Sequence, residues 1–325
     1  MQKKIILIRL DKIGDLICTL PADQVINENE YEVTWIVQKG LGQVVDLGAR
    51  KRNYFELDKN EPKKSAQQLA KIIKQVGPDI AISFQAPWWV NFELFKARIP
   101  IRTGVKSQWH SFLFLNKAIR QKRSLAVMHE LEYNLELVRR TLDLKILGEF
   151  IYFEISKPQN HKIIEKFGLQ PQKYVVVHPG MMGSALNWKQ SQYISFINQQ
   201  LLQLKKVVLT GTASDEIYLS QIRHEFKDHP HVIILQSKLN LKELSELLFY
   251  SDFVVAPSTG VAHLAASVGA SLKAIYSPIR VHHPRRWAAR GPQVKIFLPH
   301  VDCPAGHECL KQKCPQYNCM DLITL

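Results

Sequence analysis

The stretch Asp252–Gly269, DFVVAPSTGVAHLAASVG, decides the fold of the second half of this chain. Its first half, FVVA, has the length of a buried strand, and its second half, GVAHLAASV, has apolar residues at helical spacing. A strand, a small polar turn and a helix in this order direct backbone N–H groups and a positive helix end toward one point. The stretch predicts a site for an anion or a nucleotide phosphate. An ordinary strand-to-helix connection capped by Ser or Thr is the alternative.

The composition indicates two domains and anionic partners. A chain of 325 residues is too long for a single typical core. We expect a cytoplasmic protein, because the N-terminus lacks the succession of a signal peptide and no apolar run approaches the about 18 residues of a membrane span. The formal charge of +14 favours nucleic acid, an anionic lipid surface or phosphorylated substrates as partners.

The N-terminal half begins like a Rossmann-like domain. The run KIILIRL (residues 4–10) predicts a buried strand, and a helix is expected over residues 16–26, with Pro21 as a kink or a new start. The turn between them lacks G-x-G-x-x-G, so dinucleotide binding is not indicated. It carries Asp15 instead, which is ionised near neutrality and could either cap the helix or act as a general base.

The rest of this half alternates strands and helices, which predicts a doubly wound parallel sheet. Further strands are expected at residues 32–37, 54–57 and 79–84, helices at residues 63–76 and 130–147, and a linker at residues 149–160. Two domains, residues 1–157 and 158–325, follow.

Residues 86–123 differ from the rest, because aromatic and basic side chains are interleaved and no acidic residue lies between Lys96 and Arg123. Such a segment could stack on and neutralise single-stranded nucleic acid. It could also lie on an anionic membrane and hold a phosphorylated lipid head group, with Lys96, Arg98 and Arg102 as acceptor contacts. One or two core helices with a basic outer face remain the simpler alternative.

The second half repeats the alternation, with five parallel strands and four crossover helices. Strands are expected at residues 174–178, 206–210, 232–235, 253–256 and 272–276. Small polar loops follow three of these strands, HPGMMGS at residues 178–184, TGTAS at residues 210–214, and the PSTG turn. Loops at the carboxyl ends of parallel strands converge on one crevice, which favours a nucleotide-bearing ligand.

Four blocks together resemble glycosyltransferase family 9, the bacterial lipopolysaccharide heptosyltransferases. They are IILIRLDKIGDLICTLPA (5–22), VVVHPGMMGSALNW (175–188), VVLTGTASDE (207–216) and FVVAPSTGVAHLAASVGA (253–270). The resemblance covers nearly the whole chain. It implies a GT-B fold, in which two Rossmann-like doubly wound domains face an interdomain cleft.

The resemblance also implies chemistry. The first domain is expected to hold a phosphorylated Kdo–lipid A or inner-core acceptor at the cytoplasmic membrane, and the second an ADP-heptose donor. Asp15 becomes the general base of an inverting transfer without a metal or other cofactor, in keeping with the absence of a D-x-D motif. The expected donor contacts are Gly180, Ser184, Gly211, Thr212, Glu216 (or its neighbour Asp215), Ser258, Thr259, Gly260 and His263. The expected acceptor contacts near the base are Arg9, Lys12 and Gly14.

Two positions depart from the family pattern. Leu186 stands where a Lys is common, and Ser258 where an Asp is common. The lost cation could be replaced by Arg9, Lys12 or Lys189. Apart from the resemblance, a histidine such as His263 among Ala and Leu is more often a core residue than a functional one.

The last part of the chain is rich in cysteine. Cys18 reads as a small buried hydrophobe, whereas Cys303, Cys309, Cys314 and Cys319 crowd the C-terminus. In a reducing compartment these four suggest free thiols or a structural zinc rather than disulfides, and no C-x2-C pair is present.

Two other functions compete with the transferase. A sugar-nucleotide epimerase would keep the GT-B fold but act on one bound UDP-sugar without an acceptor. A nucleic-acid-binding protein would account for the charge, but no nucleic-acid fold motif occurs, so we expect no nucleic-acid partner.

Overall fold

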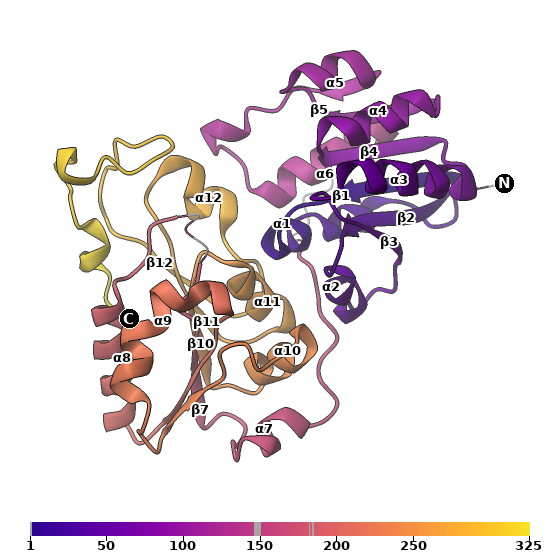
Figure 1. The fold of residues 1–325 in the computed structure, drawn as a ribbon. Helices are drawn as coiled ribbons and strands as arrows, with labels where there is room; N and C mark the ends of the chain where they lie inside the picture. Colours follow the sequence, from indigo (N-terminus) through magenta and orange to yellow (C-terminus); the bar gives the residue numbers. More distant parts are fainter. Residues whose placement is uncertain (1, 146–150, 182, 184) are drawn as a thin grey trace. The chain divides into compact units, whose positions relative to one another are not determined.

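The computed structural model describes residues 2–145, 151–181, 183 and 185–325. The chain divides into two compact units. Met1–Arg123 and Met128–Phe153 form the N-terminal unit, and Ser124–Val127 and Glu154–Leu325 form the C-terminal unit. Phe153, the last residue of the N-terminal unit, lies close to the boundary expected after residue 157. Each unit holds one parallel sheet flanked by helices (Figure 1).

The sheet of the N-terminal unit has six parallel strands in the order β3-β2-β1-β4-β5-β6. The strands are β1 (Lys3–Arg9), β2 (Tyr31–Gln38), β3 (Asn53–Leu57), β4 (Ile80–Gln85), β5 (Ile101–Val105) and β6 (Lys117–Ile119). Strand β1 lies in the middle, because it pairs with both β2 and β4. Its apolar residues are buried on both faces, as a continuous apolar run predicts for a parallel strand.

Helices cover both faces of this sheet. They are α1 (Ile13–Ile17), η1 (Leu20–Val25), α2 (Gly42–Leu47), α3 (Pro62–Val76), α4 (Trp88–Lys96), α5 (Trp109–Phe114), η2 (Arg123–Leu125) and α6 (Glu130–Leu142). The first buried cluster joins α3 and α4 to strands β1–β4. Helix α6 packs against η1, β4 and β5.

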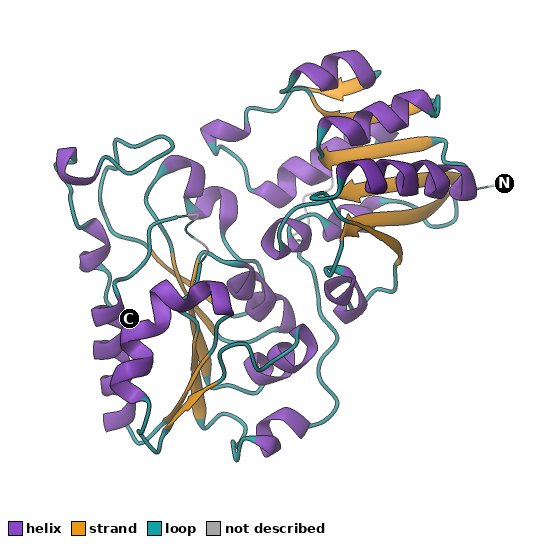
Figure 2. Cartoon of the chain, in the orientation of Figure 1, coloured by secondary structure: helices purple, strands orange, loops and turns teal. Residues whose placement is uncertain are grey.

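The C-terminal unit repeats the arrangement with the order β12-β11-β10-β7-β8-β9. Its strands are β7 (Tyr174–Val177), β8 (Lys206–Leu209), β9 (Val232–Ile234), β10 (Phe253–Pro257), β11 (Leu272–Ile275) and β12 (Val294–Phe297). Its helices are α7 (Lys162–Lys166), α8 (Gln190–Leu202), η3 (Ala213–Asp215), α9 (Glu216–Phe226), α10 (Leu241–Phe249), α11 (Gly260–Val268), η4 (Arg280–His282), α12 (Pro284–Trp287), η5 (Lys311–Lys313) and η6 (Cys319–Leu322). Figure 2 shows the strands enclosed by helices in each unit.

The C-terminal tail belongs to the core of this unit. Met320 and Ile323 are buried in one cluster with residues of α8, α9 and the central strands, and Leu325 packs against its edge. Residues within 319–325 therefore belong to a core whose other members lie between residues 175 and 297.

The predicted doubly wound α/β fold is confirmed, and several of its details are corrected. The C-terminal sheet has six strands rather than five, because β12 was missed at its edge. Strands β5 and β6 lie inside the aromatic and basic segment, for which one or two core helices were the simpler alternative. The helix expected over residues 16–26 ends at Ile17, and Pro21 lies in the first turn of the separate 3-10 helix η1.

Helix α6 is shorter than the predicted 130–147. It ends at Leu142, because Asp143 adopts a left-handed conformation with φ of 55°. Residues 146 and 147 lie outside the described residues, as does part of the expected linker. Within the described part of the chain, no helix combines the length and the apolarity that crossing a membrane requires.

Candidate active site

Each sheet reverses its strand order once, and the polar loops singled out in the sequence lie at these reversals. In the N-terminal unit the reversal falls between β1 and β4, and in the C-terminal unit between β7 and β10. Ligands of open α/β sheets bind outside the carboxyl ends of the strands at such a point. The segment after β1 (residues 10–17), which we call the Asp15 loop, carries Asp15 within the short helix α1. Gly180 lies in the loop after β7, and Gly260 begins α11 after β10.

Asp15 is held by a buried arginine. Arg9, the last residue of β1, is only 1% exposed, and its Nη2 donates to Asp15 Oδ1 at 2.7 Å. Asp15 itself is 23% exposed, so one part of the carboxylate faces Arg9 while another is open to solvent. The residue lies inside α1 rather than at its N-cap, which is Lys12, so the helix-capping alternative does not hold.

Arg9 faces two more carboxylates. Its Nε lies 3.0 Å from Asp11 Oδ2, and its Nη1 lies 3.7 Å from Glu130 Oε1. Burial alone would lower the pKa of Arg9, but the charges of Asp15, Asp11 and Glu130 outweigh it and raise that pKa. Because the guanidinium is buried among these groups, the structure favours a positioning role for Arg9 over the predicted contact with an acceptor.

Helix α6 supports the Asp15 loop from behind. Glu130 is fully buried and also pairs with Arg123. One turn later, Asn134 Nδ2 donates to the carbonyl of Cys18 and to Thr19 Oγ1, and Thr19 Oγ1 donates to the carbonyl of Asp15 at 2.6 Å. The sequence analysis missed Glu130 and Asn134. Their i, i+4 spacing on one helix face was the only local signal.

Asp11 adds a second, partly covered carboxylate to this loop. Its Oδ1 lies 3.7 Å from Lys59 Nζ. Burial raises the pKa of Asp11 and the charge of Asp15 raises it further, while Arg9 and Lys59 oppose the shift. The loop thus holds two carboxylates against one buried cation, with the more exposed Lys59 at its rim.

In the C-terminal unit, the PSTG turn forms the N-terminus of α11 as expected. Thr259 is the N-cap, and its hydroxyl accepts from the N–H of Ala262 at 3.4 Å. The alternative of a Thr cap is therefore correct for this hydroxyl, but the remaining first-turn amides have no acceptor within the helix. Ser258, Thr259 and Gly260 are partly exposed beside them, whereas His263 is buried at 4% exposure, as a core residue would be.

Asp215 is the acidic residue that organises the loop after β8. It is buried, and its Oδ2 accepts from the N–H of Thr212 at 2.8 Å and from the Thr212 hydroxyl at 2.7 Å. A Cβ on Gly180 would lie 2.2 Å from Asp215 Cγ, and one on Gly211 would lie 2.4 Å from Leu219 Cδ1. The contact at Gly180 joins the loops after β7 and β8 into one surface, whereas a methyl at Gly211 would meet the end of the flexible Leu219 side chain.

His178 lies at the end of β7 in the same place. Its imidazole Nδ1 is 3.0 Å from Thr210 Oγ1, and its backbone N–H donates to the carbonyl of Val255. Burial lowers the pKa of His178 to about 4, although the nearby Asp215 charge opposes the shift. The imidazole is consequently neutral at pH 7.

Glu216 lies apart from the buried Asp215, on an exposed side of the loops after β8 and β9. It pairs with Arg223, and its Oε2 accepts from Gln236 Nε2 at 3.1 Å. These three residues line an open cavity of about 490 Å³ together with Ser237 and Lys238. A carboxylate at the rim of such a cavity can accept hydrogen bonds from sugar hydroxyls.

Two further positions were singled out in the sequence near the donor loops. Leu186 packs against the buried core of the C-terminal unit, and Lys189 Nζ pairs with Asp321 Oδ2 at 2.6 Å. Lys189 therefore holds the C-terminal tail, and the structure gives no support to its role as a substitute phosphate cation. Ser184 lies outside the described residues.

The remaining acceptor candidates differ in accessibility. Lys12, Lys96 and Arg98 are exposed, while Gly14 is partly covered. Arg102 donates from Nε to the carbonyl of Phe114 at 2.9 Å and from Nη1 to that of Ile99. It thus ties β5 to the end of α5, and much of its donor capacity is used within the protein.

The cysteines form no disulfide in the structure. Cys18 is buried, and Cys303, Cys309, Cys314 and Cys319 are partly covered. The N–H groups of Lys311 and Gln316 point to the sulfurs of Cys309 and Cys314 at 3.4 Å. Burial and the neighbouring thiols raise the pKa of Cys319. Among the described side chains, no group of three or more His, Cys, Asp or Glu could hold a metal ion.

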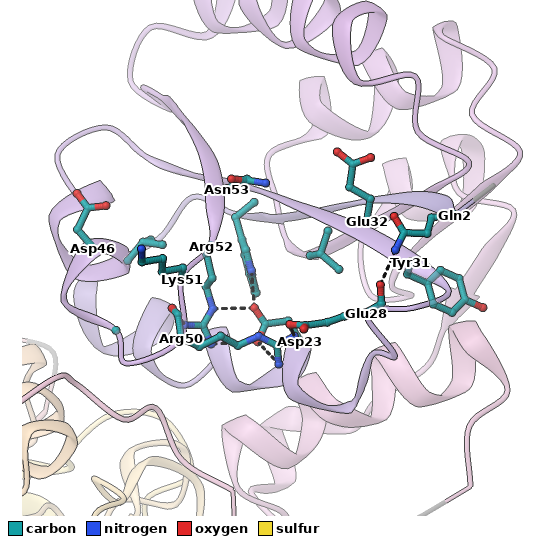
Figure 3. A pocket seen from close by; sticks show the side chains of 14 residues that line it. Gln2, Asp23, Glu28, Tyr31, Glu32, Asp46, Arg50, Lys51, Arg52 and Asn53 are labelled. Carbon is teal, nitrogen blue, oxygen red and sulfur yellow. Dashed lines mark hydrogen bonds and ion pairs between the residues drawn. The ribbon is translucent and has the colours of Figure 1, made fainter.

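A cavity of about 660 Å³ in the N-terminal unit lies away from these loops (Figure 3). It is lined by the beginnings of β2 and β3, which lie at the edge of the sheet opposite to the Asp15 loop. Two of its arginines bind carboxylates within the cavity, Arg52 to Asp23 and Arg50 to Glu28. This cavity therefore does not form part of the candidate site.

Comparison with known proteins agrees with this geometry. Residues 66–318 match glycosyltransferase family 9 (heptosyltransferase), and because the match covers most of the chain, the chain belongs to this family. It is therefore a glycosyltransferase, and the epimerase and nucleic-acid alternatives are not supported.

Individual relatives share less than a third of their residues with this chain. A candidate glycosyltransferase of Haemophilus influenzae is 27% identical over 94% of this chain and 91% of its own length. Lipooligosaccharide heptosyltransferase 2 of the same organism is 26% identical over 62% of this chain and 60% of its own. The structure of E. coli ADP-heptose lipopolysaccharide heptosyltransferase II superposes with a TM-score of 0.76, at 17% identity, over 92% of this chain and 91% of that one. This likeness confirms the GT-B fold.

Proposed function

We propose that this enzyme transfers a heptose from ADP-heptose to the inner core of lipopolysaccharide by an inverting displacement, with Asp15 as the general base. The observation that carries the proposal is the partly exposed Asp15 carboxylate, fixed by the buried Arg9 at the reversal of the N-terminal sheet. The names of the relatives supply the sugar and the acceptor class, because they include a lipooligosaccharide heptosyltransferase and an ADP-heptose enzyme.

Asp15 suits the role of base for a physical reason. Its contact with Arg9 fixes the carboxylate in one orientation, and a fixed base needs little reorganisation when the acceptor hydroxyl gives up its proton. The acceptor oxygen then forms a bond to the anomeric carbon of the donor while the bond to the diphosphate breaks. The displaced ADP carries away the electron pair of that bond.

The C-terminal unit would hold the donor. The first-turn amides of α11, with Ser258, Thr259 and Gly260, offer hydrogen bonds and the positive end of a nine-residue helix to the diphosphate. Such groups can stabilise the leaving negative charge in place of a metal ion. Gly180 and Gly211 allow the neighbouring loops to pack together beside Thr212, and Glu216 would accept hydrogen bonds from the ribose hydroxyls at its open cavity.

The proposed acceptor carries phosphate groups on its Kdo–lipid A portion, which the N-terminal unit would bind. Lys12 is exposed at the N-cap of α1, the helix that holds Asp15, and would bind one of them. Lys96 and Arg98, at the end of α4, would meet the lipid end. Arg102 would act there through the structure of β5 and α5.

The test combines binding with turnover. Among ADP, UDP, GDP and CMP, we expect ADP to raise the melting temperature most, because a ligand of the folded state stabilises it. Asp15→Asn should lower transfer by about 100-fold or more, while the shift with ADP stays unchanged. Asp46→Asn, an exposed change in the same unit, is the control. Unchanged turnover in Asp15→Asn would remove this residue from the mechanism.

A further inference from the structure

The N-terminal unit carries an exposed aromatic surface on helices α4 and α5. Its large apolar members that face solvent are Trp88, Phe92 and Phe95 of α4 and Trp109, Phe112 and Leu113 of α5. Trp109, Phe112 and Leu113 are each about 60% exposed, with values of 60%, 61% and 64%. We call these six residues the α4–α5 surface. So many large apolar side chains gathered on two adjoining helices mark an interaction site.

The charges around this surface have one sign. Lys96, Arg98 and Lys106 are exposed, and Lys106 Nζ lies 5.0 Å from the centre of the Phe112 ring. Glu93 is the only acidic residue between positions 86 and 123, and it is buried. An apolar surface with a cationic rim complements a layer of lipids with anionic head groups.

The surface is rigid, because a buried polar chain fixes α5 to α4 and β4. Ser83 Oγ donates to Asn91 Oδ1 at 2.9 Å, Asn91 Nδ2 lies 2.8 Å from His110 Nδ1, and His110 Nε2 lies 2.6 Å from Gln108 Oε1. Burial lowers the pKa of His110. The exposed side chains of α5 are thus presented without a cost of ordering the helix on binding.

The aromatic rings contact each other rather than standing apart. Trp88 stacks on Trp109 with centroids 6.4 Å apart, and Phe114 lies at 5.3 Å from Phe92 and 5.6 Å from Phe95. Single-stranded nucleic acid requires separate ring faces for successive bases. A continuous cluster with adjoining tryptophans suits the head-group region of a membrane better.

The position of the surface connects it to Asp15. Helix α4 begins directly after β4, which pairs with β1 through Arg9 and Gln85, and α5 begins after β5, the next strand. Helices α4 and α5, which begin with Trp88 and Trp109, therefore start at the same edge of the sheet as the Asp15 loop.

We propose that the α4–α5 surface docks on the anionic cytoplasmic membrane and so brings the sugar end of a lipid-anchored acceptor to Asp15. The docking itself does not depend on which sugar is transferred. Only the orientation of the acceptor rests on the function proposed above.

The experiment is pelleting of the full chain with vesicles of phosphatidylcholine alone or mixed with phosphatidylglycerol. We expect binding to the mixed vesicles that weakens as salt is added, because the attraction is screened. Phe112→Ser with Leu113→Ser should weaken it about ten-fold or more, since these two side chains lie outside the ring contacts that join α4 to α5. The control, Leu202→Ser with Leu204→Ser, removes two leucines of the C-terminal unit that are even more exposed, at 85% and 91%, and should change binding less than about two-fold.

A charge series completes the test. Lys96→Gln with Lys106→Gln should weaken binding about twenty-five-fold, because each cation contributes about five-fold. Lys71→Gln with Lys74→Gln on α3 removes the same charge elsewhere in the unit and should have a smaller effect.

Several results would overturn the proposal. These are equal binding to neutral vesicles, no pelleting of the native chain, or no difference between the α4–α5 variants and their controls. A dimer in solution that the Phe112→Ser, Leu113→Ser variant dissociates would assign the surface to a second copy instead. No donor or acceptor is needed for pelleting, so its failure is distinguishable from failure of the transferase proposal, which the ADP and turnover measurements report.

Discussion

Arg9 Nη2 lies 2.7 Å from Asp15 Oδ1, and the arginine is almost fully buried while the carboxylate is not. A buried cation thus fixes the position of a carboxylate that is accessible to solvent. Glu130 and Asp11 also contact the guanidinium, and Arg123 and Lys59 offset their extra negative charge, so the group at the end of β1 is stable only as a set.

Replacement of Arg9 should separate its electrostatic role from its geometry. Arg9→Met leaves Asp11 and Asp15 beside each other without their cation, and we expect the free energy of unfolding to fall by about 3–5 kcal/mol. Arg9→Lys keeps the charge but loses the planar donors, so it should recover much of the stability while kcat stays at least about ten-fold lower. Denaturant titration and turnover at saturating donor measure the two effects. Full turnover in folded Arg9→Lys would show that Asp15 needs no positioning by a guanidinium.

His178 predicts a specific dependence of stability on pH. Its pKa is lowered from 6.5 to about 4, so the unfolded state binds a proton at higher pH than the folded state. This contribution to stability is complete above about pH 6.5, is lost as the pH falls from there, and levels off below about pH 4. The loss should amount to roughly 3 kcal/mol.

The variant His178→Asn should lack this part of the pH dependence. Unfolding free energies at pH 7.5 and 4.5 would measure it, with the exposed His224→Asn as a control that keeps the wild-type slope. If His178→Asn kept the full slope as well, the imidazole would not be neutral in the folded protein.

Gly180 provides a test of the packed loops. In Gly180→Ala the new methyl would lie 2.2 Å from Asp215 Cγ, so Asp215 and the Thr212 amide that it binds must move. We expect a loss of stability of about 1–3 kcal/mol and weaker binding of ADP. Gly183→Ala places the same methyl in the same loop with its nearest contact at 3.6 Å, although φ is +69°. This change should lower the free energy of unfolding by about 1 kcal/mol, because alanine disfavours the left-handed conformation, and it should affect ADP affinity less.

The tail of the C-terminal unit can be tested with neighbouring residues. Ile323 is buried in the core and Leu322 is 64% exposed. Ile323→Ala should lower the free energy of unfolding by about 2–5 kcal/mol, whereas Leu322→Ala should stay within about 0.5 kcal/mol of the wild type. Equal effects in thermal or chemical denaturation would show that the tail does not pack into the core.

The central strands β1, β7 and β10 and the edge strands β3 and β9 could be predicted from the sequence, but the edge strands β6 and β12 and the inner strand β5 could not. Strands β1, β7 and β10 are continuous apolar runs because both of their faces are buried. Strands β6 and β12 lie at sheet edges, are short, and each contains a lysine. Their hydrophobic pattern therefore does not differ from that of a loop. Strand β5 was hidden by its arginine and glycine between two aromatic helices.

The candidate site was predictable where local geometry determines it. The turn at Thr259 and Gly260 follows from the succession of strand, small residues and helix. The burial of Arg9 does not, because a charged residue at a strand end normally faces water, and its partner Glu130 lies on a helix far along the chain. The division of labour between buried Asp215 and exposed Glu216 likewise depends on packing against Gly180.

The place of Met320 and Ile323 in the core of the C-terminal unit has a consequence for biosynthesis. A nascent chain cannot close the cluster around β7 until Met320 and Ile323 have left the ribosome, although that strand was translated long before. This half of the enzyme therefore matures only after those residues are free, and a premature stop codon upstream of Met320 would leave an apolar opening for chaperones and proteases to recognise.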